Sequence, residues 1–185
     1  MRGKPLAVDP DRKSCIAPII PPDARLLILG SLPGDASIAA ARYYAHPRNQ
    51  FWRLLGGVLG RDLAAMDYSD RLAVLAEARI GLWDVVASAQ RPGSLDTAMR
   101  GVAGNPLAEC VDGLPSLGAV AFNGASAAKI GRRALAGRPH LALVDLPSSS
   151  PAHATMSVAE KAKRWAALAH YCVPQTQLAA FLLHR

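Results

Sequence analysis

Four short apolar runs limit, more than any other feature, what this chain can fold into. They cover residues 25–30 (RLLILG), 80–86 (IGLWDVV), 119–122 (AVAF) and 140–146 (HLALVDL). Three of them end in segments rich in Gly, Asn, Pro or Ser, residue types that stop a strand. Continuous apolar runs of this length are typical of strands that are buried on both faces of a parallel sheet.

Helical spacing of apolar residues fills most of the intervals between these runs. We expect helices over 49–59, 69–79, 104–113, 125–136, 157–171 and 174–184. Strands that alternate with helices indicate a parallel sheet covered on both faces. The predicted fold class is therefore α/β, a three-layer α/β/α sandwich with a central, mainly parallel four-stranded sheet.

The chain has 185 residues, of which 51% are hydrophobic, and this is enough for one core. Residues 1–24 are rich in Pro and charged side chains, and we expect them to form an N-terminal arm. We expect residues 25–185 to form a single domain, because neither an internal repeat nor a long linker divides them.

Lysine and arginine outnumber aspartate and glutamate by 21 to 14, so the formal net charge is +7. A basic surplus favours a polyanionic partner such as DNA, because each neutralised phosphate releases condensed counterions. Charge alone also fits a basic protein that has no such partner.

The three cysteines, Cys15, Cys110 and Cys172, are far apart and form no CxxC pair. We therefore expect no bound metal and a reducing compartment. The chain contains no apolar stretch long enough to span a bilayer, and its first segment (MRGKPLAVDPDRKSC) lacks the apolar core of a signal peptide. These features predict a cytoplasmic protein.

The loops that follow the predicted strands indicate where a site would lie. Segments 30–35, 123–124 and 147–153 each follow the carboxyl end of a strand. Ligands of parallel sheets bind at that edge, so we expect these loops to meet there. Gly30 and Gly34 bracket a tight turn whose backbone amides can approach a ligand closely.

Several aromatic and polar side chains follow this turn, around Pro47. Tyr43 and Tyr44 are adjacent, so both cannot face the core of a regular strand, and we expect Tyr43 to pack and Tyr44 to face the loop. An aromatic ring in a cleft can stack on a base, and His46 or Arg48 could contact phosphate.

Three blocks of this sequence resemble the uracil-DNA glycosylase superfamily. They are 30–52 (GSLPGDASIAAARYYAHPRNQFW), 121–125 (AFNGA) and 146–154 (LPSSSPAHA), in the order found in that family. The first block is the specific one, and the strand plan agrees with the family's fold over most of the chain. Within the superfamily the blocks resemble the hypoxanthine-DNA (deoxyinosine) glycosylase branch, related to the mismatch-specific uracil-DNA glycosylases.

The resemblance implies a monofunctional DNA repair glycosylase. Such an enzyme flips a deaminated base out of DNA, hydrolyses its N-glycosidic bond and leaves an abasic site. The implied base is hypoxanthine, with uracil and xanthine as further candidates. We expect a monomer that needs no cofactor and no metal and whose partner is damaged DNA.

The resemblance also implies roles for individual residues. The catalytic residues would be Asn49 and Asn123. The substrate would be bound by Ser31, Leu32, Pro33, Gly34, Tyr44, His46 and Asn123. Residues 146–153 would form the loop that enters the DNA duplex, and its DNA-binding residues would be Ser148, Ser149, Ser150, Pro151 and His153.

One position departs from the family pattern. Mismatch-specific relatives have GINPG in the first turn, with an Asn that positions the attacking water, whereas this chain has Leu32 there. A leucine cannot orient water, and the hypoxanthine branch implies that Asn49 takes over this task. The missing Asn leaves a second interpretation open, a non-catalytic damaged-DNA-binding protein of the same fold.

The residues themselves allow other roles. Asn49 precedes Gln-Phe-Trp and is also suited to cap a helix. Asn123 offers a donor and an acceptor that suit the N–H and carbonyl of hypoxanthine or uracil, but Asn-Gly is also a common turn. Asp84 is the reserve candidate for a general base. Lys161, with the other basic residues of the last helix, would by default face solvent.

A nucleotide-binding fold is a third interpretation, in which the 30–35 turn would hold a phosphate. It is less favoured because neither GxGxxG nor GKS/T follows the first strand.

Overall fold

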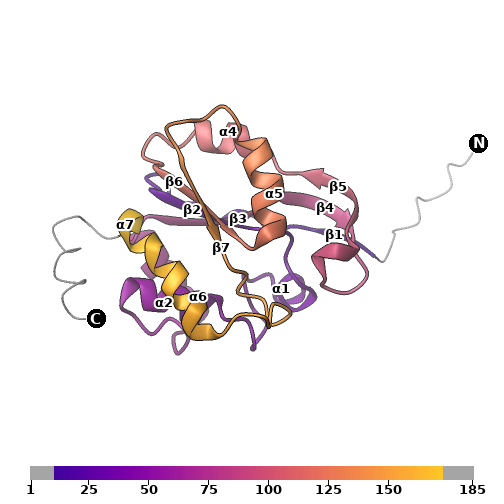
Figure 1. Ribbon diagram of the computed structural model, residues 1–185, viewed down its shortest axis with the longest axis horizontal. Coiled ribbons are helices and arrows are strands. Elements are labelled where there is room, and N and C mark those ends of the chain that lie inside the picture. Colours follow the sequence, from indigo (N-terminus) through magenta and orange to yellow (C-terminus); the bar gives the residue numbers. More distant parts are fainter. Residues whose placement is uncertain (1–10, 173–185) are drawn as a thin grey trace, which may run out of the picture.

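The central layer of the molecule is a four-stranded parallel sheet (Figure 1). The computed structural model describes residues 11–172. The strands are β2 (Leu26–Gly30), β3 (Ile80–Asp84), β6 (Ala119–Asn123) and β7 (Ala142–Leu146), in the spatial order β3-β2-β6-β7. Every pair of neighbours is parallel. The predicted fold class is confirmed, and each strand lies within one of the apolar runs or extends it by a single residue.

Helices cover both faces of this sheet, which explains why its strands are apolar throughout. On one face lie α2 (Phe51–Leu59), α3 (Tyr68–Glu77) and α6 (Val158–Trp165), and on the other lie α4 (Leu107–Asp112) and α5 (Ala125–Ala134) (Figure 1). All residues of β2, β3 and β6 are buried, whereas β7 is an edge strand and is partly open.

The helices predicted within residues 11–172 are present, with different ends. The stretch predicted as one helix over 157–171 consists of α6, a 3-10 turn η2 (Ala166–Leu168) and α7 (Ala169–Cys172). A capping box starts α6, since Ser157 and Glu160 bond to each other's backbone N–H groups. A short helix, α1 (Asp35–Ala40), was not predicted. The helix predicted over 174–184 lies outside the described residues.

A second, antiparallel sheet lies beside the first and was not predicted. It contains β1 (Arg12–Ser14), β4 (Val86–Gln90) and β5 (Arg100–Gly104), in the order β1-β4-β5. The apolar run 80–86 therefore contributes residues to both sheets, because the chain turns at Val85 between β3 and β4. Strand β1 and Ile19, which pairs with Leu82 of β3, belong to the segment expected to be an N-terminal arm. The 3-10 helix η1 (Asp96–Ala98) joins β4 to β5.

Candidate active site

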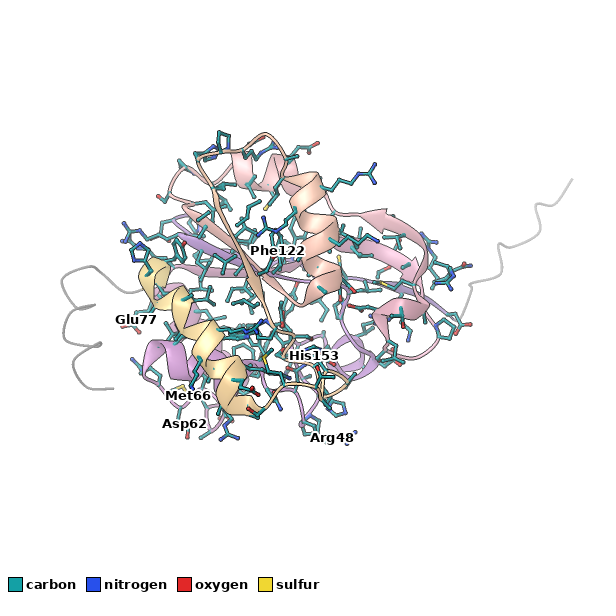
Figure 2. The ribbon with its side chains drawn as sticks, viewed as in Figure 1. Arg48, Asp62, Met66, Glu77, Phe122 and His153 are labelled. Atoms are coloured by element: carbon teal, nitrogen blue, oxygen red, sulfur yellow. The ribbon has the colours of Figure 1, made fainter. Side chains whose placement is uncertain are left out.

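The carboxyl ends of the parallel strands meet at one edge of the sheet, where a cavity of about 540 Å³ opens. Its walls are the turn after β2, the loop before α2, the segment around η1, the start of α5 and the loop after β7. All the residues that the resemblance assigned to the site line this cavity: Ser31, Leu32, Pro33, Gly34, Tyr44, His46, Asn49, Asn123, Ser148, Ser149, Ser150, Pro151 and His153. Figure 2 shows His153 and Arg48 toward the same end of the molecule.

A fully buried arginine fixes the turn after β2. The Arg91 guanidinium donates to the carbonyl of Leu32 at 2.9 Å and to the carbonyl of Pro33, and it lies 3.5 Å from the Asp96 carboxylate. The Leu32 side chain is itself buried in the core between the sheet and the α4–α5 layer. Sequence reasoning missed Arg91, because an Arg-Pro-Gly segment after a strand carries no specific signal.

Tyr44 lies at the wall of the cavity, with one face of its ring against Phe51. Its φ is +53°, a left-handed conformation that side chains rarely adopt, and its ring stacks on Phe51 at 3.7 Å between centroids with 9° between the planes. A base could stack only on the opposite face. Tyr43 packs in the core as expected, with its hydroxyl donating to the carbonyl groups of Ile16 and Ala17.

The hydroxyl of Tyr44 is buried and has no hydrogen-bond partner among residues 11–172. Burial raises the pKa of this phenol above its ordinary value, and the nearby Asp84 raises it further. Tyr44 therefore stays neutral and can donate a hydrogen bond to a ligand at any ordinary pH.

Asn49 is not the N-cap of helix α2, which is Gln50, but it lies directly before that residue. Its side-chain oxygen accepts the backbone N–H of Phe51 at 3.0 Å. An amide oxygen has a second lone pair, and the amide nitrogen has two N–H groups, so this bond leaves Asn49 able to bind water in the cavity. His46 holds the same loop, because its Nδ1 accepts the N–H of Arg48 at 3.1 Å. That bond requires the proton of a neutral His46 to be on Nε2.

Asn123 is bonded on both sides of its carboxamide to one residue. Its Nδ2 donates to Ser149 Oγ at 2.8 Å, and its Oδ1 accepts the N–H of Ser149 at 2.9 Å. One N–H and one lone pair remain, and they point away from each other. Asn123 can therefore make one hydrogen bond to a base as it stands. Pairing with an N–H and a carbonyl together requires Ser149 to move.

Hydrogen bonds to other elements fix the loop after β7 at several points. Gln50 N–H donates to Ser149 O at 3.0 Å, and Trp165 Nε1 donates to Pro147 O at 3.1 Å. Lys161 of α6, which is 1% exposed, donates to His153 O at 2.8 Å and to Gln50 Oε1 at 3.1 Å. The expectation that Lys161 faces solvent is wrong, because this buried ammonium joins the loop to the start of α2.

Asp84, at the end of β3, also lines the cavity, although sequence reasoning placed it in no motif. It is 3% exposed, and its Oδ2 has no hydrogen-bond partner among the described residues. Burial raises its pKa from 3.8 to about 7, although the charge of Arg91 acts in the opposite direction. A β-carbon at Gly30 would lie 2.6 Å from Asp84 Oδ1, so only glycine leaves room for this carboxyl.

Among residues 11–172, no group of three or more His, Cys, Asp or Glu side chains could hold a metal ion. Cys15, Cys110 and Cys172 form no disulfides with one another. No helix in the described part of the chain is long and apolar enough to cross a membrane.

Known proteins resemble this chain in sequence. A sequence model of the uracil DNA glycosylase superfamily matches residues 17–169. A hypoxanthine DNA glycosylase of Methanosarcina barkeri is 44% identical over 113 residues, which are 61% of this chain and 72% of that protein. A hypoxanthine DNA glycosylase of Methanosarcina acetivorans is 38% identical over 139 residues, 75% of this chain and 87% of that protein.

A solved structure has the same fold. It is an NMR structure of a Methanosarcina acetivorans protein described as a candidate uracil DNA glycosylase. The TM-score is 0.76 at 34% sequence identity, and the match covers 86% of this chain and 98% of the other.

Proposed function

This chain belongs to the uracil-DNA glycosylase superfamily, and from that premise we propose that it is a DNA repair glycosylase that excises hypoxanthine from deoxyinosine in DNA. It flips out the deaminated base, hydrolyses the N-glycosidic bond and leaves an abasic site. Two relatives named hypoxanthine DNA glycosylase support hypoxanthine as the main substrate. Uracil and xanthine are secondary candidates, because each also has an N–H beside a carbonyl.

The observation that carries the proposal is the convergence of three separate sequence blocks on one cavity. Residues from 30–52, 121–125 and 146–154 line it together, and its volume of about 540 Å³ is ample for one purine base. A base within duplex DNA cannot reach such a cavity, so it must first be flipped out. Unstacking costs a few kcal/mol, and less for a mispaired base than for a paired one.

Within the cavity the flipped base stacks on the face of Tyr44 opposite Phe51. Ser149 moves aside, and the Asn123 carboxamide, to which it is bonded in this structure, then bonds to the N–H and the carbonyl of hypoxanthine together. Adenine offers the reverse arrangement of donor and acceptor, so it would leave these buried groups unpaired and is rejected.

Asn49 positions the water that attacks C1′ of the sugar. Its carboxamide is held by the bond to Phe51 N–H, so the remaining lone pair and N–H groups have a fixed direction. An amide cannot accept the proton of that water as a carboxylate would. The rate therefore comes from positioning and from electrostatic stabilisation of the cationic sugar and the departing base.

The loop that contains Ser148, Ser149 and Ser150 binds the DNA backbone. Its hydroxyl and amide groups suit phosphate oxygens. Lys161 and Trp165 hold its ends, so it can enter the duplex as a stiff body and keep the gap open. The net charge of +7 strengthens the attraction to DNA.

The protein acts as a monomer, needs no metal or other cofactor, and works in the cytoplasm. The proposal that no cofactor takes part rests on Asn49, Asn123 and Tyr44, which supply polar groups that hydrolysis can use. Among the described residues, no lysine stands where it could form a Schiff base, so a lyase step is not part of the reaction.

The test is glycosylase activity on labelled duplexes that contain inosine, uracil, xanthine or adenine, followed by alkali cleavage of abasic sites. Inosine but not adenine duplexes should be cleaved. Asn49→Ala should lose at least about 100-fold in the single-turnover rate constant, as when one positioned polar group is removed, and should bind the inosine duplex as the wild type does. Equal loss of turnover and binding would refute the catalytic role of Asn49. Tight binding to lesion duplexes with no cleavage by the wild type would instead identify a damaged-DNA sensor.

A further inference from the structure

Asp84 is a buried carboxyl group for which the reaction described above has no task. It lines the cavity, it is 3% exposed, and its Oδ2 lacks a hydrogen-bond partner among residues 11–172. A buried polar atom without a hydrogen-bond partner is destabilising. Such an atom at the wall of a cavity indicates that a ligand supplies the partner.

The pairing of the strands places Asp84 beside the base-binding residues. Gly30 pairs with Asp84, and Leu29 pairs with Phe122, so Asn123 follows on the other side of Gly30. Residues that are level on neighbouring strands point to the same face of a sheet. Because Gly30 has no side chain, the space above it is occupied by the Asp84 carboxyl and the Tyr44 hydroxyl. These lie 2.6 Å and 3.3 Å from where a β-carbon would be.

Burial raises the pKa of Asp84 to about 7 against the opposing effect of its neighbours Arg91 and Tyr43. The ionisable neighbours are Arg91 and Asp96 from the segment after β4, and Tyr43 and Tyr44 from the loop before α2. The guanidinium of Arg91 bonds to the backbone carbonyls of Leu32 and Pro33 and lies beside the Asp96 carboxylate, and these groups partly neutralise its positive charge.

The Tyr43 hydroxyl donates to the carbonyls of Ile16 and Ala17, and its interaction with the Asp84 carboxyl lowers the pKa of Asp84 less than burial raises it. Burial dominates, and it raises the pKa of Asp84 to about 7. At neutral pH a large fraction of Asp84 is therefore a carboxylic acid that can donate a proton, as buried catalytic acids do.

We infer that Asp84 is the general acid of the reaction and protonates N7 of a hypoxanthine base stacked on Tyr44. This inference rests on the proposed function. In this step the C1′–N9 bond breaks, its electron pair moves into the purine ring, and the proton of the Asp84 carboxyl bonds to N7. Hypoxanthine thus leaves as a neutral molecule rather than as an anion. The water held by Asn49 adds to C1′, and the proton that it releases passes through solvent to the Asp84 carboxylate.

The step gives Asp84 a role in substrate choice. Uracil has no N7, so its departure cannot gain from this proton. Loss of the acid should therefore reduce excision of hypoxanthine more than any excision of uracil.

The experiment measures single-turnover rate constants on an inosine duplex from pH 5.5 to 9. The wild-type rate constant should be highest at low pH and fall about tenfold per pH unit above about 7, because the acid form disappears there. Asp84→Asn should be roughly 100-fold slower at pH 6.5 and lack this fall. Asp145→Asn, an exposed carboxyl on edge strand β7, is the matched control and should behave as the wild type does.

A second substrate tests the inference without any variant. A duplex with 7-deaza-deoxyinosine has no N7, so the wild type should excise its base roughly 100-fold more slowly than hypoxanthine, and Asp84→Asn should add no further loss. A wild-type rate constant that rises with pH, or an unchanged rate on the 7-deaza substrate, would overturn the inference alone. No release from inosine by the wild type at any pH would overturn the proposed function and this inference with it.

Discussion

Substitution of Gly30 by alanine probes the geometry on which the site depends. The new β-carbon would lie 2.6 Å from Asp84 Oδ1 and 3.3 Å from the Tyr44 hydroxyl oxygen. The first distance is far below a normal contact, so the Asp84 carboxyl must rotate within a buried site where it is only 3% exposed. Overpacking of this kind costs about 1–3 kcal/mol. In a domain of this size that corresponds to a fall of roughly 2–12 °C in Tm.

Activity should respond more strongly than stability. The displaced carboxyl and hydroxyl both belong to the cavity that holds the base, so excision of hypoxanthine should fall at least about tenfold, as misplaced catalytic groups commonly cause. Gly57→Ala is the matched control, because a β-carbon there would meet nothing within 4 Å and the residue lies within helix α2. It should raise Tm by roughly 1–4 °C, through a gain of about 0.5–1 kcal/mol, and leave excision unchanged.

Thermal unfolding and single-turnover excision would be measured on both variants. If Gly30→Ala matched the wild type in Tm and rate, the Asp84 carboxyl would not lie above Gly30 and the account of this wall would be refuted.

Three further predictions concern the neighbours of the cavity. Lys161→Met removes two hydrogen bonds from a buried ammonium and also its desolvation cost, so we expect a net loss of about 1–3 kcal/mol by thermal unfolding and weaker binding of the inosine duplex. Lys163→Met, an exposed neighbour on α6, should change neither by more than about 0.5 kcal/mol. Asn123→Asp replaces a donor by an acceptor, so competition between inosine and uracil duplexes should show a changed preference, and an unchanged one would contradict base recognition by Asn123. Burial raises the pKa of Asp84 in the folded state to about 7, so the folded protein binds this proton more tightly and stability is lost as pH rises from about 4 to 7. Asp84→Asn should therefore exceed the wild type in Tm by more at pH 8 than at pH 5, and an equal difference at both pH values would argue against a buried neutral carboxyl.

The central sheet could be predicted from the sequence because its strands are buried on both faces. The runs that became β2, β3 and β6 are apolar at every position or nearly so, as a strand covered by helices on both sides must be. The second sheet gave no such signal. All five residues of β5 are exposed, and β1 has only three residues, so their pairing depends on backbone bonds rather than on an apolar pattern.

The resemblance suggested residues that prove to line one cavity, but it did not indicate their physical surroundings. Tyr44, Asn49 and Asn123 were found through the resemblance of the motifs, and the cavity brings them together. The environments of Asp84 and Lys161 could not be predicted. Each depends on what other segments of the chain place around the side chain, and neither residue lies in a specific local pattern. The reciprocal bonding of Asn123 to Ser149 is likewise visible only in three dimensions.

The most direct test of the central claim is detection of the free base. The wild-type protein would be incubated with inosine and adenine duplexes, and the small-molecule fraction would be analysed by mass spectrometry. The account predicts free hypoxanthine from the inosine duplex in amounts equal to the abasic sites formed, and no free adenine from the other. Tight binding of the inosine duplex without any free hypoxanthine would contradict it.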